Sequence, residues 1–490
     1  MAQQDAIIKI AAQTSTEDLK KNLYYLASEK MQGRLMGSRG DTLASEYVAQ
    51  CFKANHIEAA YNNGINYYQA VATAKKQLQS AVLAIGNKQY ENWDGWGFAL
   101  GGTETTKLEN IPVVFAGYGI EDSRYNDFSG IDVKDKAVLI LAGQPRDNNG
   151  KYLLSGTSQP AAIAAYQRLL KDKGALVILV CNYRFAETSM QQKKRTFLPV
   201  YKNELVSNAS LPLFQLSEER VNELLANSQT TISKLQAAID NNFHPQSFEL
   251  KNTIGVHIQI GLQRGTAPNV IGVIKGADSE AGCIILSAHH DHDGTNGDDI
   301  YFGAVDNASG TTAIMEIARL INIALKSGLK PKRSIVFASY TGEERGLLGS
   351  YYFAANPLYP IEKTRAVLNI DMMGRVDTFY SGRRPDSNYA YILVKDTLNR
   401  GLRTALYSAN ESVKLKLDTY YEQPQFMQRR LTGSDQYPFF IKGVPFVRID
   451  CGFSKDYHQL TDTPDKINYE LLTKQVTLAF LTVWNMANSE

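Results

Sequence analysis

Continuous apolar runs alternate with amphipathic segments along the second half of the chain. The apolar runs cover residues 269–274, 283–288, 334–339, 366–370 and 444–449. Apolar residues recur at helical spacing elsewhere, notably over 310–324 and 469–487. Strands without polar alternation are buried on both faces, which is typical of a parallel sheet covered by helices. The pattern predicts an α/β fold whose central, mostly parallel mixed sheet is flanked by helices.

The first 77 residues show helical periodicity rather than strand-like runs. Leucines recur at helical spacing in the segment from Ser15 to about His56. Ser15, with Asp18 three residues later, is a variant of the capping box that starts helices. We therefore expect residues 1–77 to form a helical part of the same domain as residues 251–490.

Residues 78–250 have a different texture, in which glycines end short apolar runs. Strand-like and helix-like segments follow one another in this stretch, at 113–119, 136–143, 160–173 and 175–180. They form a βαβ-like unit, and the stretch holds no cluster of His, Cys or acidic residues. We expect a smaller, β-rich α/β domain inserted between the two halves of the larger one.

The composition excludes several classes of protein. The chain has 490 residues, of which 44% are hydrophobic and 21% charged, so it is neither disordered nor fibrous. Lys and Arg number 52 against 50 Asp and Glu, a balance that offers no basic field for nucleic acid. No apolar stretch approaches the ~20 residues that span a bilayer. The four cysteines form no CxxC pair. We expect no nucleic-acid partner and no membrane span, and the oligomeric state stays open.

The start of the chain bears on its location. Residues 1–5 lack the charged and apolar regions of a signal peptide. Removal of a signal peptide and addition of Met1 would leave such a start. A secreted or periplasmic protein is the expectation, although these residues alone leave the compartment open.

Polar residues follow the apolar runs of the predicted sheet. The residues that stand at or near these strand ends are His289, Asp291, Glu343, Glu344, Asp371 and His458. Asp306 lies in the turn that opens the helix after the first of these strands. Ligands of open α/β sheets bind at the carboxyl ends of the strands. We therefore expect these side chains to meet at one edge.

This set of side chains suits a metal centre. His289 and Asp291 are two residues apart, so in extended chain one can bind a metal while the other holds its imidazole. Two His and three carboxylates are a nitrogen and oxygen set that suits zinc. With Asp306 bridging, five ligands can hold two metals ~3.5–4 Å apart. Because adjacent glutamates diverge, one of Glu343 and Glu344 can ligate while the other acts as a general base.

Each of these residues alone is weak support for a site. A lone histidine at a strand end is more often structural, and adjacent glutamates are common on solvated helices. Only their joint placement at strand ends favours a metal centre. The remaining histidines are expected to pack or face solvent (His56, His244 and His257), to be structural (His290) or to be ambiguous (His292). The chain has no G-x-S-x-G elbow, H-E-x-x-H helix or Walker loop.

Several segments resemble the co-catalytic di-zinc exopeptidases, which include bacterial aminopeptidases and glutamate carboxypeptidases. The matching segments are SAHHDH (287–292), GAVDNASG (303–310), YTGEERGLLGS (340–350), NIDMMG (369–374) and DYHQLTDTPD (456–465). The segment from Leu26 to Arg34, with Gly37 and Ser38, resembles the family's opening helix and loop. The middle region resembles, more loosely, the protease-associated insert that many members carry.

The resemblance implies a role for each candidate residue. It implies one Zn²⁺ on His289, Asp306 and Asp371, and a second Zn²⁺ on Asp306, Glu344 and His458. Glu343 would be the general base, and Asp291 would hold the His289 ring. The family also implies a cis peptide bond between Asp306 and Asn307, and peptide substrates.

The resemblance and the charge of the site favour an aminopeptidase, because clustered carboxylates suit a substrate's free α-ammonium group. A carboxypeptidase of the same fold is the first alternative and needs cations for the substrate carboxylate. Arg383-Arg384 and Arg429-Arg430 are candidates, although paired arginines in polar segments are more often solvated. A non-catalytic binding relative and a single-zinc glutaminyl cyclase are further alternatives.

Two departures from the family pattern lie near the expected pocket. Gln436 stands where relatives usually have His, and residues 450–454 differ from the commoner form. Both departures leave the substrate preference open without touching the ligands. Cys451 is expected to be a small buried hydrophobe.

Overall fold

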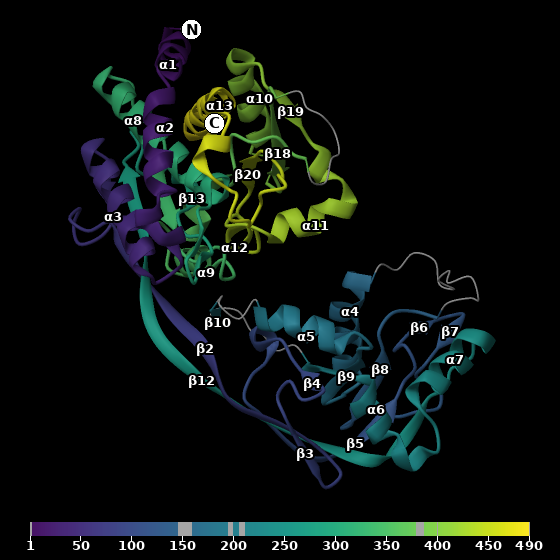
Figure 1. Ribbon diagram of the computed structural model, residues 1–490. Helices are drawn as coiled ribbons and strands as arrows, with labels where there is room; N and C mark the ends of the chain where they lie inside the picture. The colour runs from purple at the N-terminus through teal and green to yellow at the C-terminus, as the bar shows by residue number, and fades with distance from the viewer. Residues whose placement is uncertain are drawn as a thin grey trace. The chain divides into compact units, whose positions relative to one another are not determined.

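Two stretches of chain that are far apart in the sequence form one unit of the structure. The computed structural model describes residues 2–145, 159–194, 199–204, 211–378, 387–398 and 400–489. Met1–Thr73 and Arg264–Glu490 form the first unit, and Ala74–Gln263 form the second (Figure 1). The chain passes between the units within two long strands, β2 (Tyr68–Ile85) and β12 (Phe248–Ile274).

The first unit is built on a mixed sheet with a parallel centre. Its strands are β13 (Cys283–His289), β16 (Ser334–Tyr340), β17 (Thr364–Ile370), β18 (Tyr389–Lys395), β19 (Lys416–Asp418) and β20 (Phe446–Asp450). Their order is β19-β18-β20-β17-β13-β16-β12. The central strands β20, β17, β13 and β16 are parallel, whereas β18 and β12 run antiparallel to their inner neighbours. The predicted mostly parallel mixed sheet is confirmed.

Helices cover both faces of this sheet. One face packs against α1 (Ala2–Ala11), α2 (Thr16–Leu26), α3 (Arg39–Ala54), α8 (Ser309–Lys326), α10 (Leu402–Val413) and α13 (Tyr469–Asn488). The other face packs against the shorter α9 (Leu348–Ala355), α11 (Pro424–Thr432) and α12 (Tyr437–Phe440). Helix α8 is apolar almost all round and lies in the middle of the larger layer, where Ile314, Ile317 and Ile321 are fully buried. The strands are therefore buried on both sides, which explains their continuous apolar runs.

A tight loop connects helices α2 and α3 in the amino-terminal segment. The Ser15 hydroxyl accepts a hydrogen bond from the Asp18 backbone N–H (3.1 Å) and so caps α2 as predicted. The loop includes η1 (Glu29–Arg34), in which Gly33 has φ +66°. A Cβ on Gly33 would lie 2.3 Å from the Gly294 carbonyl oxygen, so only glycine fits this close approach. The loop thereby brings Arg34 against the segment that follows β13.

The second unit has a smaller sheet of its own. Its strands run in the order β12-β5-β8-β9-β11-β4, with β5 (Thr106–Phe115), β8 (Ala137–Leu141), β9 (Val177–Cys181), β11 (Leu213–Leu216) and β4 (Trp96–Gly97). Strands β8 and β9 are parallel, and α4 (Gln159–Asp172) connects them, so the predicted βαβ unit is confirmed. Helices α6 (Glu218–Leu224) and α7 (Ile232–Asn242) pack into its core. The metal-ligating clusters found among the described residues all lie in the first unit.

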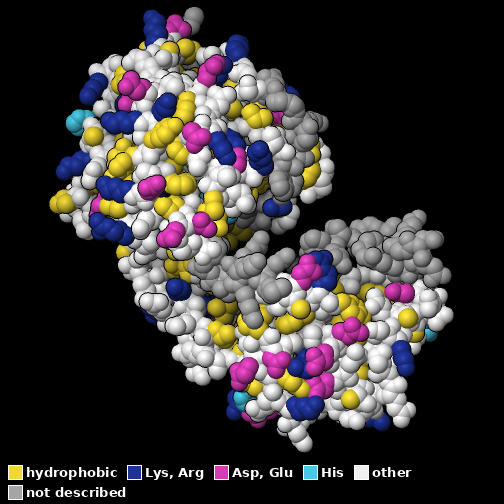
Figure 2. Space-filling view, viewed as in Figure 1, with side chains coloured by type: hydrophobic (Ala, Val, Ile, Leu, Met, Phe, Trp, Pro, Cys, Tyr) yellow, Lys and Arg dark blue, Asp and Glu magenta, His cyan; other side chains and the backbone are white. Residues whose placement is uncertain are grey.

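The surface agrees with the balanced composition. On the face in view, basic and acidic side chains are interspersed rather than gathered by sign (Figure 2). No helix in the described part of the chain combines the length and the apolar character that crossing a membrane requires.

Candidate metal centre

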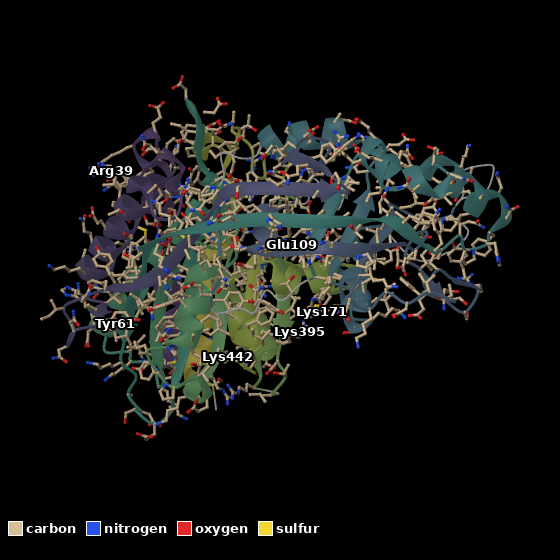
Figure 3. The ribbon with its side chains drawn as sticks, turned by 90° about the horizontal axis from the view of Figure 1, so that it is seen from below. Arg39, Tyr61, Glu109, Lys171, Lys395 and Lys442 are labelled. Atoms are coloured by element: carbon tan, nitrogen blue, oxygen red, sulfur yellow. The ribbon has the colours of Figure 1, made fainter. Side chains whose placement is uncertain are left out.

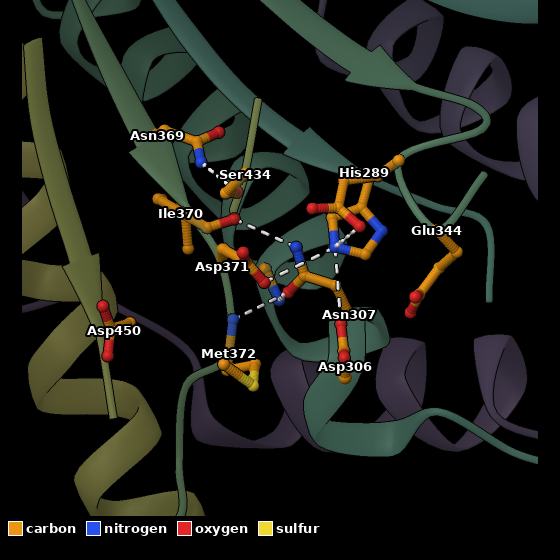
Figure 4. A network of polar contacts seen from close by, with 12 residues as sticks. His289, Asp306, Asn307, Glu344, Asn369, Ile370, Asp371, Met372, Ser434 and Asp450 are labelled. Carbon is orange, nitrogen blue, oxygen red and sulfur yellow. Dashed lines mark hydrogen bonds and ion pairs between the residues drawn. The ribbon is translucent and has the colours of Figure 1, made fainter. Parts of the chain in front are cut away.

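The parallel strands of the first unit bring polar residues to one edge of the sheet (Figure 4). His289 is the last residue of β13, and Asp371 directly follows β17. Asp306 lies in η4 (Ala304–Ala308), just before α8. One ligand atom each from His289, Asp306 and Asp371 lie within 4.8 Å of one another, and all three residues are buried. Three residues from distant parts of the chain thus form one compact cluster.

The spacing within this cluster fits a cation. The His289 Nε2 atom lies 3.4 Å from Asp306 Oδ1 and 3.4 Å from Asp371 Oδ1. This nitrogen is buried and has no hydrogen-bond partner among the described residues. Ligand atoms at the corners of a tetrahedron around zinc, with bonds of about 2.0–2.1 Å, lie about 3.3 Å apart. The three side chains therefore fit zinc, as do their nitrogen and oxygen donors.

A second group of ligand atoms shares Asp306 with the first. His458, in the loop after β20, has its Nε2 atom 3.1 Å from Asp306 Oδ2 and 3.3 Å from Glu344 Oε2. Asp306 therefore presents one carboxylate oxygen to His289 and the other to His458. The His458 side chain is 30% exposed, against 1% for His289. The two halves of the cluster differ in their access to water.

Asp291 orients groups on both sides of the cluster. Its Oδ1 atom lies 3.5 Å from the His289 Nδ1 atom, and its carboxylate accepts the backbone N–H groups of Glu343 (3.1 Å) and Glu344 (3.3 Å). The residue is fully buried. A carboxylate in this position fixes the ring and its tautomer. The predicted position of Asp291 beside His289 agrees with the geometry.

Two further residues lie beside the cluster: Asp293, which was not singled out from the sequence, and His292, whose role the sequence left ambiguous. Asp293 Oδ2 lies 2.9 Å from the His458 Nδ1 atom, and His292 Nδ1 lies 2.8 Å from Glu344 Oε1. In extended chain, side chains two residues apart point to the same side. Asp293 stands two residues after Asp291, just as Asp291 stands two residues after His289, so the same spacing could have identified Asp293 from the sequence. His292 also forms, with Asp306 and Glu344, a group whose ligand atoms lie within 4.8 Å of one another.

Hydrogen bonds between loops hold the Asp306 carboxylate in place. The peptide bond between Asp306 and Asn307 is cis, as the resemblance implies. The Asn307 side chain donates to the Ile370 carbonyl (3.0 Å) and accepts from the Met372 N–H (3.1 Å), as Figure 4 shows. Asn307 therefore ties the loop of Asp306 to the loop that carries Asp371. Asp462 accepts the Asp306 N–H (3.3 Å) from the other side.

Arg34 supports the cluster from behind. Its side chain is fully buried and donates to four carbonyl oxygens, those of Leu26, His290, Phe302 and Gly303. Burial lowers the pKa of Arg34 to about 10, although the charge of Asp291 opposes this effect. Arg39, five residues later, is exposed at the start of α3 (Figure 3). The arginine of the opening loop is thus part of the scaffold of the site.

A buried chain of charges supports Asp371. Arg448, on β20, places Nη2 3.0 Å from Asp371 Oδ2 and Nε 3.2 Å from Asp450 Oδ2. Arg430 also pairs with Asp450, and it is only 3% exposed. The expectation that Arg430 is solvated is wrong, because this ion pair and the rings of Tyr421 and Phe453 enclose it. Arg383 and Arg384 lie outside the described residues.

The charges of the cluster shift the pKa of its members. Burial raises the pKa of Glu343 well above its usual range, and Glu344 and Asp371 add to this effect while His289 opposes it. Burial alone would lower the pKa of His458, but Glu344, Asp293 and Asp306 outweigh it and raise the pKa to about 12. The cluster therefore favours a cation, either a proton or a metal, between its imidazoles and carboxylates.

The departures from the family pattern have structural roles. Gln436 is fully buried, where its side chain accepts from Asn369 Nδ2 (3.0 Å) and donates to the Leu431 carbonyl (2.9 Å). It therefore supports β17. Cys451 is buried as expected, and burial raises the pKa of its thiol.

The other histidines stand apart from the cluster. His56, His244 and His257 are exposed. His290 is fully buried, with its Nδ1 atom 2.9 Å from Ser339 Oγ and its Nε2 atom 3.1 Å from Asp41 Oδ1. Its expected structural role agrees with these contacts.

The sheet and its helical layers are shared with aminopeptidases of known structure. Residues 269–483 match the model of peptidase family M28, so this part of the chain is similar to that family. In overall structure it is similar to an aminopeptidase from Aneurinibacillus sp. strain AM-1, with a TM-score of 0.55, 19% identity and coverage of 99% and 97% of the two chains. A zinc aminopeptidase from Bacillus subtilis matches with a TM-score of 0.51, 16% identity and coverage of 96% and 94%. Both likenesses show the fold.

Curated relatives match over shorter segments. Probable glutamate carboxypeptidase VP8 of Zea mays is 32% identical over 201 residues, which are 40% of this chain and 26% of the relative. Aminopeptidase NAALADL1 of Mus musculus is 37% identical over 133 residues, or 26% and 17% of the two chains. The matches thus span about a quarter or less of these relatives' length.

Proposed function

We propose that this protein is a zinc-dependent exopeptidase, and specifically an aminopeptidase that removes N-terminal residues from peptides. The observation that carries the proposal is the arrangement around Asp306. Its two oxygens face the Nε2 atoms of His289 and His458 at 3.4 and 3.1 Å, and Glu343 lies beside them. This arrangement supports two metal positions that share one carboxylate.

Five side chains would hold the metals. His289, Asp306 and Asp371 would bind one zinc, and Asp306, Glu344 and His458 would bind the other. Zinc bound there would supply Lewis acidity, which polarises a peptide carbonyl and acidifies a water molecule. Asp291 would orient His289, and Arg448 would hold the outer oxygen of Asp371.

Glu343 has the position of a general base. Its Oε2 atom lies 4.0 Å from His289 Nε2, and its side chain is 13% exposed, so it borders both the cluster and solvent. Glu343 would take a proton from the attacking water and pass it to the leaving amine.

The charge of the site supports an aminopeptidase over a carboxypeptidase. The carboxylates of the cluster suit a substrate's free α-ammonium group. Arg430, one candidate for holding a substrate carboxylate, is already engaged by Asp450. Carboxypeptidase activity is the alternative, in keeping with the name of the Zea mays relative.

Two features of the whole protein belong to the same proposal. The second unit would be a protease-associated type of insert, since it is a separate α/β unit and its described residues contribute nothing to the metal-ligating clusters. A secreted or periplasmic location would give the enzyme access to peptides outside the cytoplasm. Both are proposals about the whole chain.

The test compares the protein with its Glu343→Gln variant. Loss of the base should lower kcat for amino-acid p-nitroanilides by about 10²–10⁴-fold, while elemental analysis still finds the parental zinc content. Glu362→Gln, at an exposed position, is the matched control. Hydrolysis by Glu343→Gln at the parental rate would show that the base is wrongly assigned. Cleavage only of peptides with a blocked N-terminus and a free C-terminus would favour the carboxypeptidase.

A further inference from the structure

Asp293 occupies the outer side of the His458 ring. Its Oδ2 atom lies 2.9 Å from His458 Nδ1, while the opposite ring nitrogen faces Asp306 and Glu344. The Asp293 side chain is only 6% exposed, against 30% for His458. A buried carboxylate thus holds a ring that solvent can reach.

This contact repeats, on the second histidine, the arrangement that Asp291 makes with His289. A metal-binding imidazole usually donates its other N–H to a carboxylate, which fixes the tautomer and makes the ring a better donor. If Asp293 holds a proton on Nδ1 of His458, the Nε2 lone pair stays available for a metal that Asp306 and Glu344 would also bind. His289 has a strand to place it, whereas His458 has φ +54° in a loop. The carboxylate contact is therefore more important for His458.

Asp293 is itself held in place by an ion pair. Its Oδ1 atom pairs with the guanidinium of Arg345, whose side chain is 7% exposed. Arg345 directly follows Glu343 and Glu344, so this pair links the loop after β13 to the loop after β16. The preceding residue, His292, contacts Glu344 Oε1 at 2.8 Å. Three loops are thus joined around the His458 half of the cluster.

We infer that Asp293 is a positioning residue for the metal bound by His458 and Glu344. The inference rests on the proposed function, because it assumes that these side chains hold a metal. Asp293 acts on the ring nitrogen that faces away from the metal and does not touch substrate. Its loss should therefore weaken one metal position and leave the position of His289 and Asp371 intact.

The test measures zinc binding rather than activity alone. The protein and its Asp293→Asn variant are dialysed against graded zinc buffers, and zinc per chain is determined. The variant should bind its second zinc about 10–100-fold more weakly and its first zinc normally. Cobalt substitution gives a second readout, because the absorption of the second equivalent should appear only at higher Co²⁺. Asp298→Asn is the control, because Asp298 is exposed and lies in the same segment between β13 and α8.

A double variant separates positioning from folding. Asp293→Asn alone leaves the Arg345 charge without its partner, so Asp293→Asn with Arg345→Gln removes both charges. The same selective loss of the second zinc in the double variant, with unchanged circular dichroism, supports the inference. Two zincs bound at parental affinity, or loss of both zincs from both variants, would overturn it. A parental protein that binds no zinc and cleaves no peptide would instead refute the proposed function.

Discussion

The metal cluster has two halves that share Asp306: the His289 half, with Asp371, and the His458 half, with Glu344. Each half contains one histidine, but the two histidines are held in place in different ways. His289 ends strand β13, where the neighbouring strands β16 and β17 hold its backbone in parallel register. His458 lies in a loop, and its ring is placed by side chains, namely Asp293 at 2.9 Å and the rings of His292 and Tyr457. A ligand held by a sheet loses little freedom when metal binds, whereas a ligand held by a loop loses more. We therefore expect the halves to bind metal with unequal affinity.

The largest effect is expected at the residue that both halves share. Asp306→Ala removes one carboxylate oxygen from each half, so both zincs should be lost and activity should fall by at least 10³-fold, since neither nucleophile nor carbonyl is activated. Zinc per chain after gel filtration checks this. Retention of one full equivalent would show that the halves are more independent than the shared carboxylate suggests.

The two histidines should give unequal results when each is removed. His289→Ala takes away a fully buried partner of Asp291, Asp306 and Asp371 and should lower the free energy of unfolding of the zinc-free protein by about 3 kcal/mol. His458→Ala removes a partly exposed ring and should lower it by about 1 kcal/mol.

The same pair of variants also tests metal binding. His458→Ala should retain one zinc, whereas His289→Ala should lose the more tightly bound zinc. Chemical denaturation with chelator, and zinc analysis without it, measure the two effects. Equal losses of stability and of zinc in His289→Ala and His458→Ala would contradict the expected difference between the halves.

The smallest effect is expected at Arg448, which contacts the carboxylate of Asp371 in the His289 half. Arg448→Met frees the outer oxygen of Asp371 and should weaken the zinc of the His289 half about 10–100-fold, leaving that of the His458 half unchanged. The zinc titration used for Asp293→Asn reports it. Lys442→Met is the control, because Lys442 is exposed after α12 (Figure 3). If Arg448→Met also weakened the zinc of the His458 half, Arg448 would support both halves of the cluster.

Much of the site could be predicted because its residues stand next to strong local signals. His289 and Asp371 directly follow apolar runs, and strand ends of a parallel sheet share an edge. Asp293 was missed because the period of two was applied to Asp291 only. Arg448 was missed because it lies inside an apolar run. A buried arginine requires a partner, and that partner could have been sought among the carboxylates of the next strand end.

Sequence by itself determined the alternation of strands and helices, the parallel centre of the sheet and the edge of the sheet at which the candidate metal ligands lie. These follow from local periodicity and from the order of polar residues after apolar strands. Tertiary structure alone decided which oxygen of Asp306 faces which histidine, and which carboxylate holds each ring. His458 and Asp306 are 152 residues apart, so no local pattern records their contact. The physical reason is that hydrogen-bond partners are selected by packing between loops, which depends on the whole folded unit.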